Sequence, residues 1–228
     1  MNKEQLTQVL ADLDISADKL LLRLINATGM TTEAIREMFD VPLHLVSDIQ
    51  EVRPGMFLTN EGYVTKNYVA DKTTALVLGT RKGKVKAMYL EGEEMPFSTG
   101  GLFVDTTGHN GLEATRMIVK EAREQHLPAE AAEYCQEFSL PGLVEKGDAF
   151  LLSIEEVREV QSYFFNIQEA LRSVHFTSGC LWSSSISKDH ETPCADVYAL
   201  RSMTAYPESM RFVQFVHPAF WVPFRKSN

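Results

Sequence analysis

Apolar residues are spaced in two different ways along the chain, and the change comes near residue 50. Over residues 1–50 they recur three or four positions apart, which is the interval of amphipathic helices. Thr31 stands where it can cap a helix, and Pro42 stands where it can begin the next one. The pattern predicts a small helical bundle that ends near Gln50.

From Val52 onward, short apolar runs alternate with glycine-containing turns and then with helical stretches. In chain order, the pattern predicts hairpins over residues 56–64 and 75–90, helices over 111–138 and 154–171, and strands over 181–224. Pro128 should break the first helical stretch. Ser153, with Glu156 three residues later, forms the capping-box signature at the start of the second. Together these segments indicate an α+β domain over residues 51–228, preceded by the helical bundle.

The amino-acid composition excludes several classes of protein but does not indicate a function. The chain has 228 residues, of which 44% are hydrophobic and 23% are charged, and these values are ordinary for a globular protein. They exclude a disordered, collagen-like or disulfide-scaffold protein. The net charge of −9 provides no general attraction to nucleic acid phosphates, so no nucleic-acid partner is expected.

Targeting signals and cysteine usage both favour a reducing compartment. The N-terminal residues lack the basic start and apolar run of a secretory signal, and no apolar run is long enough to span a bilayer. We expect a cytoplasmic protein with no membrane partner. The three cysteines, an odd number without close pairing, favour free thiols, although pairing of Cys180 with Cys194 stays open.

Residues 31–50 have the layout of a helix-turn-helix, which places a second helix in the major groove of DNA. That second helix carries His44, Ser47 and Asp48 but no lysine or arginine before Arg53, so phosphate contacts would be poor. A protein-binding or structural bundle is the preferred interpretation. A DNA-binding regulator remains an alternative.

Residues with catalytic or metal-binding chemistry are present but poorly arranged. Four side chains could be drawn as a zinc set, namely His175, Cys180, His190 and Cys194, yet their spacing is irregular. The serines at 183–185 lack the Gly-x-Ser-x-Gly turn that exposes a nucleophile. We therefore expect no catalytic residues, no metal and no cofactor, and keep a metal- or cysteine-dependent enzyme as a second alternative.

Several short motifs follow one another in a recognisable order. They are Asp148–Ser153, Glu156–Val157, Asn166–Ile167, Leu181–Ser185 and Val216–Phe220. In this order they resemble a bacterial and phage family of domains of unknown function with a C-type-lectin-like fold. That family is related to formylglycine-generating enzymes and to phage receptor-binding and variable proteins. The resemblance covers residues 52–224 and implies a C-type-lectin-like domain in which Trp182 plugs the core.

The resemblance implies binding and not the best-known activities of the fold. The chain has no Glu-Pro-Asn, Gln-Pro-Asp or Trp-Asn-Asp run, so a calcium-dependent sugar site is not implied. It also lacks the close cysteine pair of a formylglycine-generating enzyme. We therefore expect a non-enzymatic binding or display module, including a phage or prophage virion component.

The predicted module has two contact regions. Residues 1–50 would mediate homo-oligomerisation or attachment to a virion partner. Loops over residues 186–195 and 202–210 would recognise a protein or cell-surface ligand, because loops of such a fold usually carry recognition. The candidate ligand-binding residues, chosen as aromatic and polar side chains of this C-terminal region, are His190, Tyr198, Tyr206 and Arg211.

Overall fold

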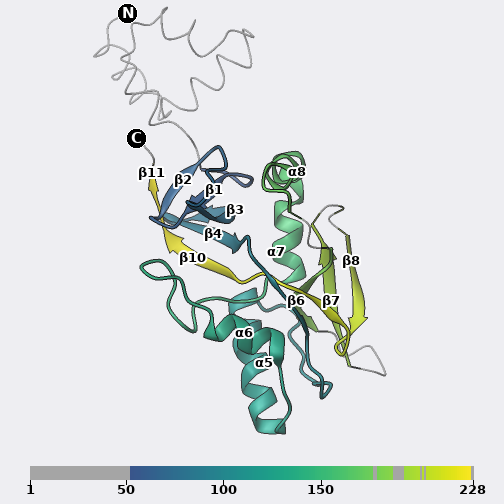
Figure 1. The fold of residues 1–228 in the computed structure, drawn as a ribbon. Helices are drawn as coiled ribbons and strands as arrows, with labels where there is room; N and C mark the ends of the chain where they lie inside the picture. The colour runs from purple at the N-terminus through teal and green to yellow at the C-terminus, as the bar shows by residue number, and fades with distance from the viewer. Residues whose placement is uncertain (1–51, 177–178, 187–192, 201, 203, 227–228) are drawn as a thin grey trace, which may run out of the picture. The chain divides into compact units, whose positions relative to one another are not determined.

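The computed structural model describes residues 52–176, 179–186, 193–200, 202 and 204–226, which belong to one compact unit (Figure 1). The predicted helical bundle, its helix-turn-helix segment and His190 lie outside these residues. The described part contains two mostly antiparallel sheets together with helices, so the predicted α+β class is confirmed. Among the helices described, none is both long and apolar enough to cross a membrane.

The first sheet is built from both ends of the described unit. Its strands are β1 (Phe57–Thr59), β2 (Tyr63–Thr65), β3 (Thr73–Arg81), β4 (Lys84–Tyr89), β10 (Ala219–Pro223) and β11 (Arg225–Lys226). They are ordered β10-β4-β3-β1-β2-β11. The two outer strands, β10 and β11, are separated in the chain by Phe224 alone. The sheet therefore closes on itself as a small barrel.

Alternating side chains of this barrel enter two different cores. Leu58 and Val77 belong to a cluster inside the barrel, and residues 144–149 of a connecting segment contribute to the same cluster. Their neighbours Phe57 and Leu76 belong to a cluster outside it. This period of two is the expected consequence of the pleat. The antiparallel pairing of β1 with β2 and of β3 with β4 confirms the predicted hairpins over residues 56–64 and 75–90.

The helices come from the middle of the chain. They are α5 (Gly111–Gln125), α6 (Glu130–Glu137), α7 (Ile154–Glu159) and α8 (Phe164–Ser173), and the short 3-10 helix η1 (Val160–Tyr163) joins the last two. The predicted break near Pro128 is confirmed. The single helix predicted over residues 154–171 is instead interrupted by η1, which changes the direction of the chain before α8 begins.

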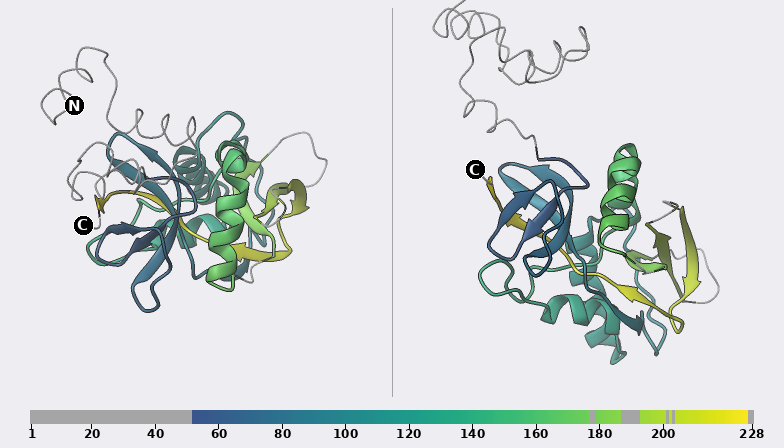
Figure 2. Two further views of the ribbon diagram at one scale, coloured as in Figure 1. Left: turned by 90° about the horizontal axis from the view of Figure 1, so that it is seen from above. Right: turned by 45° about the horizontal axis from the view of Figure 1, so that its top comes forward.

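The second sheet has helices on both faces. Its strands are β5 (Glu93–Pro96), β6 (Leu181–Ile186), β7 (Cys194–Ala199), β8 (Thr204–Ser209) and β9 (Val213–Val216), ordered β5-β9-β6-β7-β8. Leu181 and Tyr198 face α7, α8 and the outside of the barrel. Trp182 and Val197 face α5 and α6. Figure 2 shows α8, in green, between the barrel strands and the second sheet.

Trp182 is 1% exposed, which confirms its predicted place in the core. Its ring packs edge-to-face on Phe97 with centroids 5.4 Å apart, and its indole N–H donates to the Met95 carbonyl at 3.0 Å. Both the apolar ring and its single polar group are therefore satisfied.

A buried ion pair ties the barrel to two helices. Lys86 on β4 lies 3.1 Å from Glu156 on α7, and the two side chains are 5% and 9% exposed. The other carboxylate oxygen of Glu156 accepts from the backbone N–H of Ser153, completing the predicted capping box, and from that of Gly111, the first residue of α5. One carboxylate thus serves the N-termini of both helices.

Residues 202–210 were predicted as a recognition loop, but most of them form the edge strand β8. Its sequence is mostly polar and contains a proline, so it lacks the alternation of apolar and polar residues that predicts a strand. Pro207 has no N–H, and the N–H of Ser209 donates to the Glu208 carboxylate at 2.9 Å. Because alternate residues of a strand direct their N–H groups the same way, these features blunt the edge against pairing with another chain.

Candidate functional site

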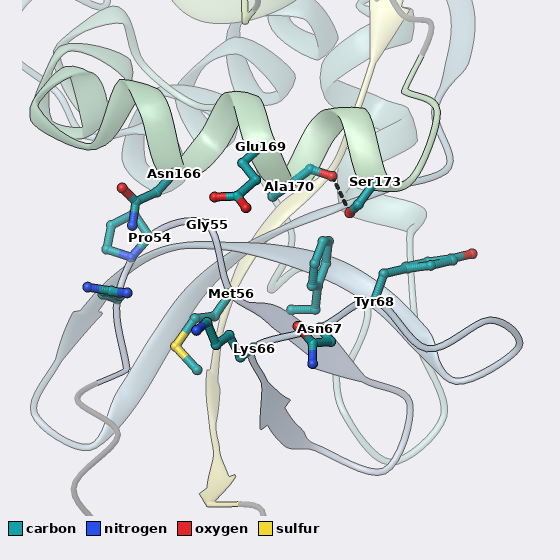
Figure 3. Close-up of a pocket in the computed structure, with 12 residues that line it drawn as sticks. Pro54, Gly55, Met56, Lys66, Asn67, Tyr68, Asn166, Glu169, Ala170 and Ser173 are labelled. Atoms are coloured by element: carbon teal, nitrogen blue, oxygen red, sulfur yellow. Dashed lines mark hydrogen bonds between the residues drawn. The ribbon is translucent and has the colours of Figure 1, made fainter. Parts of the chain in front are cut away.

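A pocket of about 380 Å³ lies between the barrel and α8 (Figure 3). One wall is the segment that leads into β1 together with the residues that follow β2. The other wall is the face of α8 that carries Asn166, Glu169 and Ser173. The lining residues are Arg53, Pro54, Gly55, Met56, Phe57, Lys66, Asn67, Tyr68, Asn166, Glu169, Ala170 and Ser173.

Gly55 sets how closely the two walls approach. It has a φ of +93°, and a Cβ at this position would lie 2.8 Å from backbone atoms of Asn166. Its N–H donates to the Val77 carbonyl on β3 at 3.0 Å, which fixes the segment to the barrel. Glycine is therefore required here both for the backbone conformation and for the contact with α8.

The wall after β2 is held by short local bonds. The Thr65 hydroxyl donates to the Asn67 carbonyl at 2.9 Å, and the Val69 N–H donates to the Thr73 hydroxyl at 2.9 Å. The Tyr68 ring meets the buried Phe57 ring edge-to-face, with centroids 5.9 Å apart, and Tyr68 is still 41% exposed. An aromatic surface is thus presented to the pocket in a fixed place.

α8 is anchored by the residues on its opposite face. Ile167 and Leu171 are buried in the cluster that joins the barrel, the helices and the second sheet. The Ser173 hydroxyl donates to the Ala170 carbonyl at 2.7 Å, so its oxygen is left to accept a hydrogen bond from the pocket. This wall is therefore set by the core and not by the pocket's contents.

The charges of the pocket are divided between its walls. Arg53 and Lys66 belong to the barrel wall, and Glu169 belongs to α8, from which it points over the strands in Figure 3. Within the described ranges, no hydrogen bond or ion pair uses the charged ends of these three side chains. The pocket therefore offers two cations and one anion, with amide groups of Asn67 and Asn166 beside them.

This lining suits recognition by charge and hydrogen bonding. Guanidinium and ammonium groups donate to anions, a carboxylate accepts from cations, and amides do both. The lining residues include no histidine or cysteine. The chemistry on display is therefore that of holding a polar molecule in one orientation.

None of the predicted ligand-binding residues lines this pocket. Tyr198 is 1% exposed, so its side chain is absent from the surface of the described domain. Tyr206 is on β8, 42% exposed, and Arg211 is exposed in the turn from β8 to β9. His190 lies outside the described residues. Of the three candidates that the structure describes, buried Tyr198 cannot form a surface site with Tyr206 and Arg211.

Tyr206 has a specific partner that the sequence did not suggest. Its hydroxyl lies 3.1 Å from the Cys180 sulfur, and this hydrogen bond, followed by partial desolvation, raises the pKa of Tyr206 to about 12. The phenol therefore stays protonated at neutral pH and acts only as a hydrogen-bonding group.

The register of β6 and β7 decides the open question about Cys180 and Cys194. Leu181 pairs with Tyr198, and Ile186 pairs with Ala195, so the two cysteines lie at opposite ends of this strand pair. At about 3.4 Å per residue their separation is roughly 17 Å. A disulfide needs Cα atoms within about 7 Å. The two cysteines can share neither a disulfide nor a zinc ion in this fold.

We accordingly expect all the cysteines to be free thiols in protein purified without reductant. Alkylation followed by peptide mass spectrometry should label Cys180 and Cys194 in the native protein, since both are partly exposed. Cys135 should be labelled only after denaturation, because complete burial raises the pKa of its thiol and blocks access. A peptide containing a Cys180–Cys194 crosslink would contradict the register.

Metal ligands are not gathered elsewhere in the described part of the chain either. No group of three or more histidine, cysteine, aspartate or glutamate side chains there could hold a metal ion. Two members of the proposed zinc set, Cys180 and Cys194, are separated, and His190 is outside the described residues.

Sequence analysis missed the pocket because its walls are about a hundred positions apart in the chain. Asn166 was noticed only as part of a family-like motif. The one local signal was Pro54-Gly55, a turn-forming pair placed immediately before a strand. Such a pair predicts a bend but not what lies across from it.

The chain was also compared with known proteins. No family model and no curated protein matches it. Among solved structures, a fimbrial protein from Bacteroides ovatus is similar at 11% sequence identity and a TM-score of 0.46. The match covers 76% of this chain and 49% of that one, so the chain spans about half the length of this neighbour. A likeness of this strength leaves the function to be argued from the chain's own residues.

Proposed function

We propose that residues 52–226 form a non-enzymatic binding module that holds a small polar ligand in the pocket between the barrel and α8. The observation that carries this proposal is that three charged side chains line the pocket, Arg53 and Lys66 from the barrel side and Glu169 from α8, and that the described fold does not use them. A volume of about 380 Å³ is at the lower end of the range for small-molecule sites, so a compact ligand is indicated.

The pocket is suited to binding because both walls are held from behind. The barrel wall is fixed by the interior of the barrel, and α8 is fixed by the core cluster on its opposite face. A ligand therefore does not have to order these elements when it binds, and less of the interaction energy is lost. This proposal places recognition in the pocket and not in the C-terminal loops.

The other parts of the sequence hypothesis remain predictions. We retain the proposed resemblance to the C-type-lectin-like family. Members of that fold contain both helices and strands, as an α+β domain does. A role as a phage or prophage virion component, with residues 1–50 as an assembly or attachment region, also stays a prediction. The DNA-binding alternative concerns the same residues, outside the described part.

The proposal predicts that small polar compounds perturb a defined set of residues. We expect at least one compound from a library of organic acids, amino acids, sugars and nucleotides to shift backbone amide NMR signals of the full chain within residues 53–57, 66–68 and 166–173. Glu169→Gln combined with Lys66→Met should weaken that binding about tenfold or more, because charge-assisted hydrogen bonds are lost.

A matched control uses a charged pair on another helix. Lys120 and Glu124 form an exposed pair on α5, 3.7 Å apart, and neither lines the pocket. Lys120→Met with Glu124→Gln should leave binding unchanged. Binding that maps only to other residues, or no binding at millimolar concentrations of any compound, would count against the proposed function.

A further inference from the structure

The pocket's charges are arranged for a ligand that carries both signs. Glu169 and the cations Arg53 and Lys66 line the same small space, yet no ion pair joins Glu169 to either cation. Each charge is therefore left on its own wall, with room between the walls. A ligand of a single sign would meet attraction from one wall and repulsion from the other.

Hydrogen-bonding chemistry assigns an end of the ligand to each wall. A guanidinium presents a planar fork that fits a carboxylate, and Lys66 can add a second positive charge on the same side. A carboxylate such as Glu169 accepts hydrogen bonds from an ammonium group. The amides of Asn67 and Asn166 can serve either end.

The remaining lining is apolar and aromatic. Met56 and Phe57 belong to the barrel's two cores, and Tyr68 lies edge-to-face against Phe57 while staying 41% exposed. This surface can cover an apolar substituent that projects between the two charged ends. Met56 and Tyr68 are both labelled on the strand side of the pocket in Figure 3.

We propose that the pocket binds a small zwitterion of the free amino acid class. Its carboxylate lies on Arg53 and Lys66, its ammonium group lies on Glu169, and its side chain lies against Tyr68. This inference rests on the proposed binding function and names its ligand. It excludes the end of a peptide as the principal ligand, because a peptide terminus carries only one of the two charges next to its terminal residue.

The test compares zwitterions with blocked derivatives on the full chain. The probes are glycine, L-leucine and L-phenylalanine, together with N-acetyl-L-phenylalanine and L-phenylalanine methyl ester, and binding is followed by backbone amide shifts and calorimetry. At least one free amino acid should bind in the pocket. Each blocked derivative should bind roughly tenfold or more weakly than free phenylalanine, because one charge-assisted hydrogen-bonding group is lost.

Pocket variants separate the two ends of the ligand. Glu169→Gln should weaken the binding of free phenylalanine but not that of N-acetyl-phenylalanine, which has no ammonium group and is relieved of the repulsion between its carboxylate and Glu169. Lys66→Met should weaken the binding of free phenylalanine but not that of the methyl ester, which has no carboxylate and is relieved of the repulsion between its ammonium group and Lys66. Tyr68→Ala should weaken the binding of phenylalanine more than the binding of glycine. The α5 double variant with Lys120→Met and Glu124→Gln serves as the control for general charge effects.

The outcomes also separate this inference from the function on which it rests. If blocked and free phenylalanine bind equally in the pocket, the zwitterion assignment is wrong and the binding function stands. The zwitterion assignment is also wrong if no amino acid binds but another compound of the polar library shifts the pocket residues. If nothing shifts them, both proposals fail.

Discussion

Glu156→Ala is expected to lower the free energy of unfolding by about 3–5 kcal/mol, the usual cost of removing one partner of a buried ion pair. The substitution leaves Lys86, which is 5% exposed, with the exposed Glu159 carboxylate at 3.4 Å and the Trp221 ring, whose centroid is 5.5 Å from the ammonium nitrogen. It also removes the acceptor for the N–H groups of Ser153 and Gly111, at 3.0 and 3.1 Å. Chemical denaturation of the variant and of the unmodified protein at pH 7 gives the difference.

Gly111 makes room for the Glu156 carboxylate at the start of α5. A Cβ at Gly111 would lie 2.5 Å from the Glu156 carboxylate oxygen, so only glycine lets the acid reach the start of α5. The same carboxylate completes the capping box of α7. The loss is therefore felt at both helix N-termini and at the barrel strand that carries Lys86.

The neighbouring acid provides the matched control. Glu155 is also in the first turn of α7, but its side chain is 62% exposed and lies 3.9 Å from Arg158. Glu155→Ala should cost no more than about 0.5 kcal/mol. A similar cost for Glu155→Ala and Glu156→Ala would show that the buried pair does not stabilise the fold.

A double substitution tests whether charge is the cause. Lys86→Met alone leaves Glu156 buried without its cation, whereas Lys86→Met with Glu156→Gln removes both charges together. The double variant should be destabilised by less than the sum of Lys86→Met and Glu156→Gln measured singly, because neither charge is left unpaired in the core.

Acidification should destabilise the domain through His217, with a loss of roughly 3 kcal/mol between pH 6.5 and pH 4 at 1.36 kcal/mol per pKa unit. Burial is the main cause, and it lowers the pKa of His217 to about 4 from the usual 6.5. Above pH 6.5 the imidazole is neutral in both folded and unfolded chains, so it adds no penalty. Between pH 6.5 and about pH 4, His217 is protonated in the unfolded chain but stays neutral in the folded chain, so the unfolded state is favoured as the pH falls.

The environment of His217 accounts for this preference. The residue is 3% exposed, its ring lies 4.9 Å from the Phe176 ring, and its Nδ1–H donates to the Tyr89 carbonyl at 2.9 Å. A Cβ at Gly92 would overlap the imidazole. Little room is left for the water that a charged imidazolium would need.

The free energy of unfolding, measured by denaturation at pH values from 7 down to 4, should therefore fall more steeply with pH for the unmodified protein than for His217→Gln. Glutamine keeps a hydrogen-bond donor but does not titrate in this range. The variant has its own cost at pH 7, so the comparison concerns the slope and not the absolute stability. Equal slopes for the two proteins would show that another group controls the acid response.

Local features of this fold could be predicted from the sequence, because their signals lie within one element. Ser153 and Glu156 are three positions apart, and the capping box forms as that spacing indicates. Trp182 is in the core, as the family resemblance implies. The reach of Glu156 to Gly111 carries no such signal, because the two residues are 45 positions apart.

Side-chain exposure in the second sheet could not be predicted from strand alternation. That sheet has helices against both faces, so Tyr198 and its neighbour Val197 are both buried. Tyr198 was therefore a poor candidate for a surface ligand. The pocket was missed for a related reason, because facing walls contributed by β1, β2 and α8 become neighbours only when the barrel packs on the helix.

The final strands give the domain a particular order of assembly during protein synthesis. Residues 213–226 supply β9, which lies between β5 and β6, and also β10 and β11, which close the barrel. The second sheet cannot be complete until residue 216 has left the ribosome exit tunnel, and the barrel cannot close until residue 226 has left it. Until then the strands already synthesised have unpaired edges. Such edges can pair with other chains, so the nascent chain is exposed to aggregation.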